Sequence, residues 1–211
     1  MGKTKIIFSC GELSLEGVLA ISEGNGPFPA VIVCHPHPLY GGSMDNNVVN
    51  SISEALTQVS IIAFKFNFRG VGRSEGAFSG GIGEQEDVKA AISFVTKVKE
   101  VDSKRVGLAG YSAGVTFAFP VAFNNPQIKA LAAVSPPLSM SNFDFLKGCL
   151  KPKFLICGTR DDLIPISQFL NFCQNLPDPK ENYSIEGADH FWWGYESVIA
   201  AKVANFFARV L

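Results

Sequence analysis

The sequence has little charge and no apolar run long enough to cross a membrane. Asp, Glu, Lys and Arg make up 18% of its 211 residues, and the formal net charge is -1. A chain so close to neutral has no field of one sign that would attract nucleic acid or an acidic lipid surface. Its apolar runs stop short of the roughly 18 residues that a membrane-spanning helix needs. We therefore expect neither a nucleic-acid partner nor a membrane partner.

Cysteine is present five times, but never in a Cys-x-x-Cys spacing. That spacing is typical of zinc clips and redox-active pairs, so neither is expected. Cys34 and Cys157 fall inside apolar, strand-like runs, where a free thiol behaves as a small hydrophobic side chain. Scattered, unpaired cysteines are typical of a reducing compartment, and we expect the protein to be cytoplasmic.

Strand-like and helix-like segments alternate along a chain that is 47% hydrophobic. Repeated alternation predicts an α/β fold with a mostly parallel sheet and helices on both faces, and the first two strands read as an antiparallel hairpin. No linker or repeat interrupts the pattern, so we expect one domain over residues 1–211. The predicted strands cover residues 5–9, 13–21, 30–34, 61–66, 105–109, 128–134, 153–157 and 182–185. The predicted helices cover residues 46–59, 83–101, 113–123, 166–176 and 195–210.

The motif Gly-Tyr-Ser-Ala-Gly at residues 110–114 joins a predicted strand to a predicted helix. A serine at the centre of such a turn projects its hydroxyl above the sheet, and the flanking glycines allow backbone to pass close by. A chance match at a helix cap is the alternative, but the strand before and the helix after are what the nucleophile turn requires. Ser112 is therefore the candidate nucleophile.

A serine hydroxyl needs a base, and in this kind of fold the base follows an acid in the chain. His190 is the only histidine after Ser112 and lies between the last strand and the last helix. The Gly-x-x-Asp-x-x-x-Pro spacing favours Asp161 as the acid that orients His190. Its neighbour Asp162 is expected to cap the following turn, and Asp189 to be structural.

The loop after residue 34 reads His-Pro-His-Pro-Leu-Tyr and is the expected source of an oxyanion donor. Proline has no N–H to donate. The predicted pair of backbone donors is therefore Ala113 and His37, with Leu39 and Tyr40 as weaker alternatives for the second position.

His35 and His37 also have a spacing that resembles a pair of metal ligands. A metal site needs further ligands, and the third and last histidine is already assigned as the base. We expect no metal and no cofactor. The competing interpretation is that these two histidines anchor the loop.

With these residues in place, the chain resembles the α/β-hydrolase superfamily over nearly its whole length. The segments 35–46 and 67–76 are similar to small hydrolases near dienelactone hydrolase and the compact carboxylesterases. The resemblance implies an α/β-hydrolase fold with a Ser-Asp-His triad. Dienelactone hydrolases use a cysteine nucleophile where this chain has Ser112, so a lactone substrate is not implied. Arg69, in the second segment, is expected to bond neighbouring carbonyl groups.

Only residues 135–152 separate two predicted strands where related enzymes often carry a large cap. That length holds one short helix, expected near residues 142–149, so the cap should be minimal and the site open. Aromatic and aliphatic side chains around it are candidate walls for a substrate, with core packing as the alternative for each. The candidate wall residues are Leu39, Tyr40, Tyr111, Met140, Phe143 and Trp192.

These features predict a serine hydrolase, with carboxylesterase as the leading activity. The expected partner is a small-molecule ester, neutral and of small or medium size, cleaved through an acyl-Ser112 intermediate. A peptidase or acyltransferase with the same triad is the first alternative, and a non-catalytic binding protein that keeps the fold is the second. The sequence leaves the oligomeric state open.

Overall fold

A computed structural model describes residues 2–211 and shows eight strands and five α-helices over that range. The strands are β1 (Gly2–Cys10), β2 (Leu13–Ile21), β3 (Phe28–Cys34), β4 (Ile62–Phe66), β5 (Val101–Tyr111), β6 (Ile128–Val134), β7 (Lys153–Gly158) and β8 (Lys180–Ile185). The helices are α1 (Asn47–Gln58), α2 (Ile82–Val95), α3 (Ala113–Asn124), α4 (Ile166–Gln174) and α5 (Glu196–Val210). Two short 3-10 helices, η1 (Pro38–Tyr40) and η2 (Asp144–Gly148), lie in loops.

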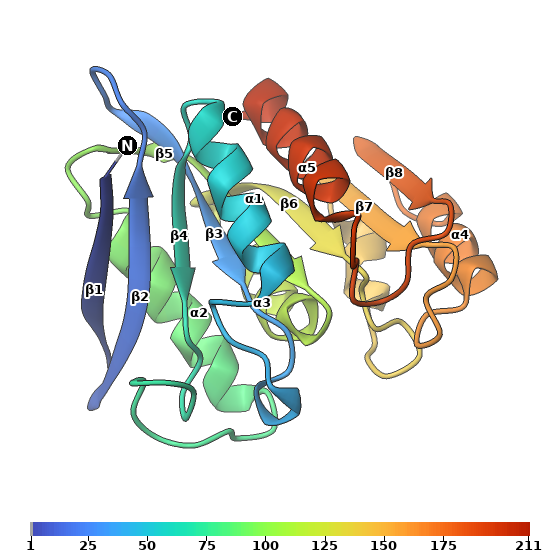
Figure 1. The fold of residues 1–211 in the computed structure, drawn as a ribbon, viewed down its shortest axis with the longest axis horizontal. Helices are drawn as coiled ribbons and strands as arrows, with labels where there is room; N and C mark the ends of the chain where they lie inside the picture. Colours follow the sequence, from blue (N-terminus) through green and yellow to red (C-terminus); the bar gives the residue numbers. More distant parts are fainter. Residues whose placement is uncertain (1) are drawn as a thin grey trace.

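All eight strands form one sheet in the order β1-β2-β4-β3-β5-β6-β7-β8 (Figure 1). From β4 to β8 every neighbouring pair is parallel, whereas β1 pairs antiparallel with β2, and β2 antiparallel with β4. The predicted parallel sheet with an antiparallel amino-terminal hairpin is confirmed. Parallel strands direct their carboxyl ends to the same edge, so the loops that follow β3 and β5 to β8 meet there.

Helices cover both faces of the sheet, which explains why its central strands are apolar throughout. Helices α1 and α5 pack on one face, and α2, α3 and α4 on the other. In α1 the buried apolar residues recur at helical spacing, as Val48, Val49, Ile52 and Leu56. Each face of the sheet thus packs against its own hydrophobic cluster.

Two predicted helices differ most from the structure. Helix α2 ends at Val95, because a tightened turn follows in which Lys97 donates to the carbonyl of Phe94 and Val98 to that of Val95. The expected helix at 142–149 is the 3-10 turn η2. The connection between β6 and β7 therefore carries only a minimal cap, as predicted.

Strands β1 and β8 form the two edges of the sheet and carry charged side chains. Lys3 and Lys5 are exposed on β1, and Lys180 and Glu181 are partly exposed on β8. No helix of residues 2–211 has the length and apolar character needed to cross a bilayer.

Candidate active site

Ser112 sits in the sharp turn that connects β5 to α3. Its backbone φ is +53°, a left-handed conformation that is strained for a residue with a side chain. Two close approaches explain the flanking glycines. A Cβ on Gly110 would lie 2.7 Å from the backbone nitrogen of Val115, and one on Gly114 would lie 2.5 Å from the carbonyl oxygen of Cys34. The start of α3 is therefore pressed against the end of β3.

Three side chains from three loops form a continuous hydrogen-bonded chain at this edge. The Nε2 atom of His190 lies 3.0 Å from the Ser112 hydroxyl, and its Nδ1 atom lies 2.8 Å from Oδ2 of Asp161. Asp161 and His190 are both buried, at 6% exposure each. The distances match those of a serine nucleophile, a general base and an orienting acid.

Asp161 is held rigidly by the turn in which it lies. Its Oδ1 atom accepts hydrogen bonds from the backbone N–H groups of Leu163 and Ile164, both at 3.0 Å. The thiol of Cys157 approaches Oδ2 at 3.8 Å, and burial, followed by the charge of Asp161, raises the pKa of that thiol. The turn-capping role expected of Asp162 thus belongs to Asp161 itself, because the Asp161 carboxylate faces the N–H groups and Asp162 is exposed to solvent.

Several hydrogen bonds hold the loop that carries His190 in place. The Tyr111 hydroxyl donates to the His190 carbonyl oxygen at 2.8 Å, and burial raises the pKa of Tyr111, so the phenol stays protonated. Asp189 accepts the N–H groups of Phe191 and Trp192, in line with the structural role expected of it. The Trp192 indole donates to the hydroxyl of Ser135 at 3.1 Å.

Three of the six candidate wall residues lie in the interior. Trp192 is 0% exposed, and Tyr111 and Phe143 are also buried, so these side chains differ from the expectation of an open wall. Trp192 and Tyr111 fasten the histidine loop, as described above. Phe143 borders a cavity of about 510 Å³ between η2 and α4. The sequence pattern around an aromatic residue does not show whether its side chain lines a site or anchors a loop, so the burial of these residues could not be inferred.

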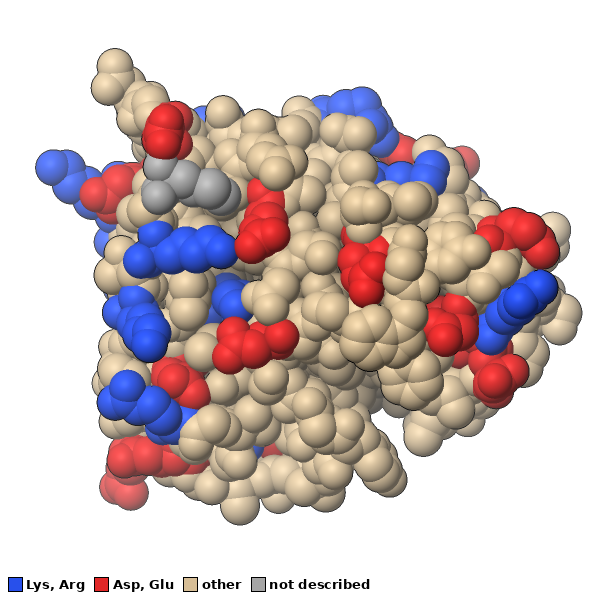
Figure 2. Space-filling view, viewed as in Figure 1, with Lys and Arg blue, Asp and Glu red and all other residues tan. Residues whose placement is uncertain are grey.

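The other three candidates are exposed and belong to a larger apolar rim. This rim consists of apolar side chains that are between 51% and 84% exposed and lie within eight residues of the carboxyl ends of β3, β6, β7 and β8. Its members are Leu39, Tyr40, Met140, Leu163, Phe191 and Trp193. Figure 2 shows mostly uncharged side chains over the lower middle of the view, below the carboxyl ends of β3 and β4. Sequence reasoning did not single out Leu163 or Phe191, because an isolated apolar residue next to a buried one gives no periodic signal.

Two backbone N–H groups near Ser112 are left available. Ala113 is the first residue of α3, where no preceding helical carbonyl can accept its N–H. The N–H of His37 has no hydrogen-bond acceptor within residues 2–211. By contrast, the N–H groups of Leu39 and Tyr40 are bonded to the His37 ring and the His37 carbonyl. The geometry favours His37 over these two alternatives as the second donor.

The imidazoles of His35 and His37 have separate surroundings. His35 is fully buried beside Phe68, whereas the His37 ring lies among Tyr40, Phe78 and Phe117. Partial burial lowers the pKa of His37. Within residues 2–211, no group of three or more His, Cys, Asp or Glu side chains is arranged to hold a metal ion.

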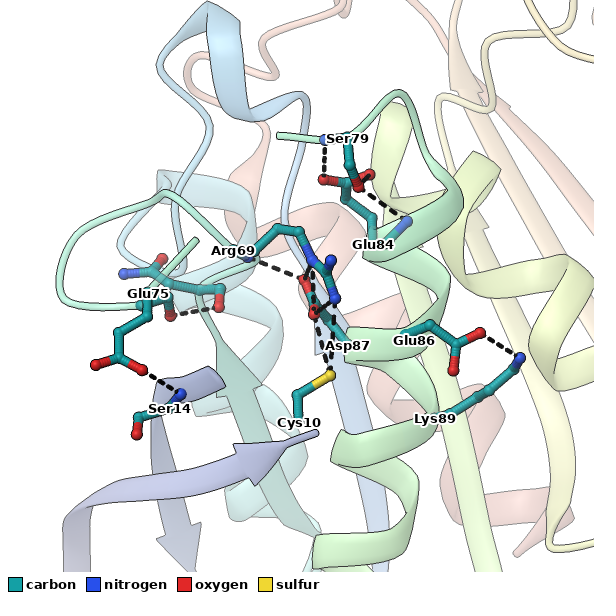
Figure 3. A network of polar contacts seen from close by, with 12 residues as sticks. Cys10, Ser14, Arg69, Glu75, Ser79, Glu84, Glu86, Asp87 and Lys89 are labelled. Atoms are coloured by element: carbon teal, nitrogen blue, oxygen red, sulfur yellow. Dashed lines mark hydrogen bonds and ion pairs between the residues drawn. The ribbon is translucent and has the colours of Figure 1, made fainter. Parts of the chain in front are cut away.

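Arg69 forms an ion pair instead of the carbonyl contacts expected from its loop. Its guanidinium donates to both carboxylate oxygens of the buried Asp87 in α2, the shortest contact being 2.7 Å (Figure 3). Cys10 of β1 lies against the same pair, with its thiol 3.4 Å from Asp87 Oδ1. The carboxylate is a stronger partner for a guanidinium than a carbonyl. This network fixes the loop after β4.

The X-Pro dipeptidyl-peptidase (S15) family matches residues 25–190 of the sequence, a range that includes Ser112, Asp161 and His190. The chain belongs to the S15 family. This family lies within the α/β-hydrolase superfamily, so the resemblance predicted from the motifs is confirmed. Among curated relatives, this S15 chain is similar to an uncharacterized protein of Rickettsia prowazekii, with 31% identity over 209 residues that cover 95% of the chain and 87% of the relative.

Solved structures similar to this S15 member include two α/β serine hydrolases. An alpha-beta serine hydrolase homologue from Coxiella burnetii has 31% identity and a TM-score of 0.88, and the match covers 97% of each chain. A serine hydrolase without lid from Xanthomonas campestris has 25% identity and a TM-score of 0.88, over 100% of this chain and 96% of that one. The hydrolase class and the α/β-hydrolase fold without a large lid are thereby shown.

Proposed function

We propose that the protein is a carboxylesterase that cleaves small or medium neutral esters through an acyl-Ser112 intermediate. The observation that carries this proposal is the unbroken chain from the Ser112 hydroxyl through both ring nitrogens of His190 to Asp161. The serine hydrolase structures to which the chain is similar support the same chemistry.

In the proposed reaction, the Ser112 oxygen attacks the ester carbonyl carbon while Nε2 of His190 takes the hydroxyl proton. Asp161 accepts the Nδ1–H of His190 and stabilises the imidazolium that forms. The tetrahedral intermediate then collapses, the His190 proton passes to the leaving alcohol, and the acyl group stays on Ser112. A water molecule, deprotonated by His190, releases the acid and restores the serine.

Negative charge develops on the carbonyl oxygen in both steps. The N–H groups of Ala113 and His37 are the proposed donors to this oxygen. Donors fixed in place before the reaction stabilise the transition state more than the substrate, and removal of one such donor typically slows turnover about 100- to 1,000-fold. The positions of both groups in the backbone explain why no side chain is needed for this task.

The proposed substrate class follows from the surroundings of Ser112. The apolar rim offers contact area to the hydrocarbon part of an ester, and its exposed members are not charged. An anionic acyl group would need cationic partners, and the segments 35–46 and 186–195, which carry four of the rim residues, contain no Lys or Arg. A neutral, partly apolar ester fits this rim best.

The decisive test uses a fluorophosphonate probe together with p-nitrophenyl esters. The wild type should be labelled and should hydrolyse the esters, whereas Ser112→Ala should lose labelling and at least 10,000-fold of its turnover, about the loss that removal of a triad member causes. Ser139→Ala is the matched control, because Ser139 is an exposed serine on the loop after β6. Labelling that persists in Ser112→Ala would contradict the assignment. A well-folded wild type that is never labelled would favour a binding protein.

A peptidase is the second candidate, because the family that matches residues 25–190 is described as X-Pro dipeptidyl-peptidase. Amide cleavage by the same triad requires protonation of a poorer leaving group. Aminoacyl-proline amides measured beside the ester panel separate the two activities. A higher kcat/KM for the amides than for the best ester would replace the esterase proposal with the peptidase.

A further inference from the structure

The ring of His35 contacts two backbone groups that lie on opposite sides of it. Its Nε2 atom is 3.1 Å from the backbone nitrogen of Phe68, and its Nδ1 atom is 2.6 Å from the carbonyl oxygen of Pro36. The side chain is fully buried, with its ring at 4.7 Å from that of Phe68. His35 is one of only three histidines, and the proposed ester hydrolysis does not use it directly.

These contacts determine which ring nitrogen carries the proton. The N–H of Phe68 can only donate, so Nε2 of His35 must offer its lone pair. A neutral imidazole has a single N–H, which must then be on Nδ1, where it donates to the Pro36 carbonyl. Burial lowers the pKa of His35 to about 4, so the ring is neutral near pH 7. The Phe68 amide thus selects the tautomer that binds Pro36.

The Pro36 carbonyl belongs to the same peptide group as the N–H of His37. This peptide is trans, since the cis bonds among the described residues lie at Gly26-Pro27 and Asp178-Pro179. In a trans peptide the C=O and N–H bonds point in opposite directions. Because the carbonyl is directed at the His35 ring, the N–H of His37 must be directed away from it, and it has no acceptor within residues 2–211.

We propose that His35 is a positioning residue, which holds the Pro36–His37 peptide so that the His37 N–H faces the oxyanion of the substrate bound at Ser112. This inference rests on the proposed esterase function. The opposite orientation of the peptide would direct the Pro36 carbonyl at the developing negative charge, where it would repel the oxyanion. His35 therefore acts through His37 and does not touch the substrate.

Other residues already anchor the rest of this loop. Asn67 accepts the Met44 N–H at 2.7 Å, and Lys65 donates to the carbonyl of Met44 and to the side chains of Asp45 and Asn50. The loop thus has its own fixed points at its far end. The contact of His35 with Pro36 acts on the one peptide that carries the donor.

Two substitutions separate the two contacts of the ring. In His35→Asn the side-chain amide nitrogen takes the place of Nδ1 and can still donate to Pro36, but the Phe68 N–H loses its acceptor. In His35→Gln the amide oxygen takes the place of Nε2 and can accept from Phe68, but the donor to Pro36 is lost. Each variant keeps one of the two buried hydrogen bonds, so each is the control for the other in stability.

We expect His35→Gln to lower kcat on p-nitrophenyl esters about 100-fold with KM changed less than threefold, the pattern for loss of a transition-state donor. His35→Asn should keep kcat within about tenfold of wild type. A thionoester, whose sulfur accepts hydrogen bonds poorly, should lose much less rate in His35→Gln than the matching oxygen ester. Equal losses of kcat in both variants, or equal losses on both substrates, would overturn the inference.

Fluorophosphonate labelling distinguishes this inference from the function on which it rests. If the wild type is neither labelled nor active, the proposed function fails; if it is both and the two variants behave alike, only the role of His35 fails. Nitrogen NMR of the wild type, labelled at its three histidines, gives a test that needs no variant. We expect His35 to be protonated at Nδ1 only, and protonation at Nε2 would contradict the proposal.

Discussion

At the scale of single residues, the buried ring of His35 links the stability of the fold to pH. Burial lowers its pKa from 6.5 to about 4, so the folded protein binds this proton less readily than the unfolded chain. The contribution of His35 to stability is therefore complete above pH 6.5, declines as the pH falls from 6.5 to 4, and is constant below that. By linkage, the free energy of unfolding should drop by about 3 kcal/mol across this window.

Urea unfolding of wild type and His35→Asn at several pH values measures this contribution. The difference between the two curves should change between pH 6.5 and 4, because the variant has no group at position 35 that titrates there. Carboxylates that titrate in both proteins cancel in the difference. A difference that stays constant over this range would show that His35 has a normal pKa in the folded protein.

Asp161 should matter through the tautomer of His190. In Asp161→Asn, the amide oxygen can keep the contacts with Leu163 and Ile164, but the amide nitrogen then faces Nδ1 and favours the tautomer whose Nε2 carries the proton. Nε2 could no longer accept the Ser112 proton. We expect kcat on p-nitrophenyl esters to fall about 10,000-fold with little change in melting temperature. Asp162→Asn is the control and should keep wild-type turnover.

At the scale of elements, the ion pair between Arg69 and Asp87 joins the loop after β4 to helix α2. Asp87 is fully buried, so Asp87→Asn leaves the guanidinium without its charged partner. Unfolding free energy should fall by about 3 kcal/mol, as it does when one partner of a buried pair is removed. Glu86→Gln breaks the exposed pair with Lys89 in the same helix and should cost about 0.5 kcal/mol or less. Comparable losses in the two variants would contradict this interpretation.

The elements themselves were largely predictable, because buried parallel strands and amphipathic helices leave regular patterns in sequence. The predicted span of β2 and that of β6 agree with the structure at both ends. Helix α2 was predicted too long, since Val98 and Val101 continue an apolar pattern after the helix has ended. Local spacing cannot show where a tightened turn takes over from a helix.

The candidate site was predictable where a motif has one geometric solution. Ser112 lies in a turn that demands glycines, and His190 was identified by the lack of another histidine downstream. Trp192 and Arg69 were not predictable, because their partners, Ser135 and Asp87, are distant in the chain. Only the folded chain brings such pairs together.

At the scale of the whole molecule, the connection between β6 and β7 is too short to form a large lid over the candidate site at Ser112. In an enzyme with a large lid, the rate of hydrolysis can increase when the lid opens at a lipid aggregate. Here the connection contains only the short helix η2. We expect the rate of ester hydrolysis to rise hyperbolically with substrate concentration, with no jump where the ester begins to form micelles. Initial rates on a soluble and a micelle-forming p-nitrophenyl ester test this expectation. A sharp increase at the micelle threshold would indicate a segment that opens.

The charged residues on the two edge strands, lysines on β1 and Lys180 and Glu181 on β8, affect how copies of the molecule can associate. An edge strand presents unpaired backbone groups, and a strand from another chain can extend the sheet there. If two copies paired through their β1 strands, Lys3 and Lys5 of one copy would lie close to those of the other, and their positive charges would repel. At the other edge, a docked strand would reduce the solvent exposure of the charged side chains of Lys180 and Glu181, which are partly exposed. The charged side chains on both edge strands thus disfavour pairing of the sheet with a strand of another copy.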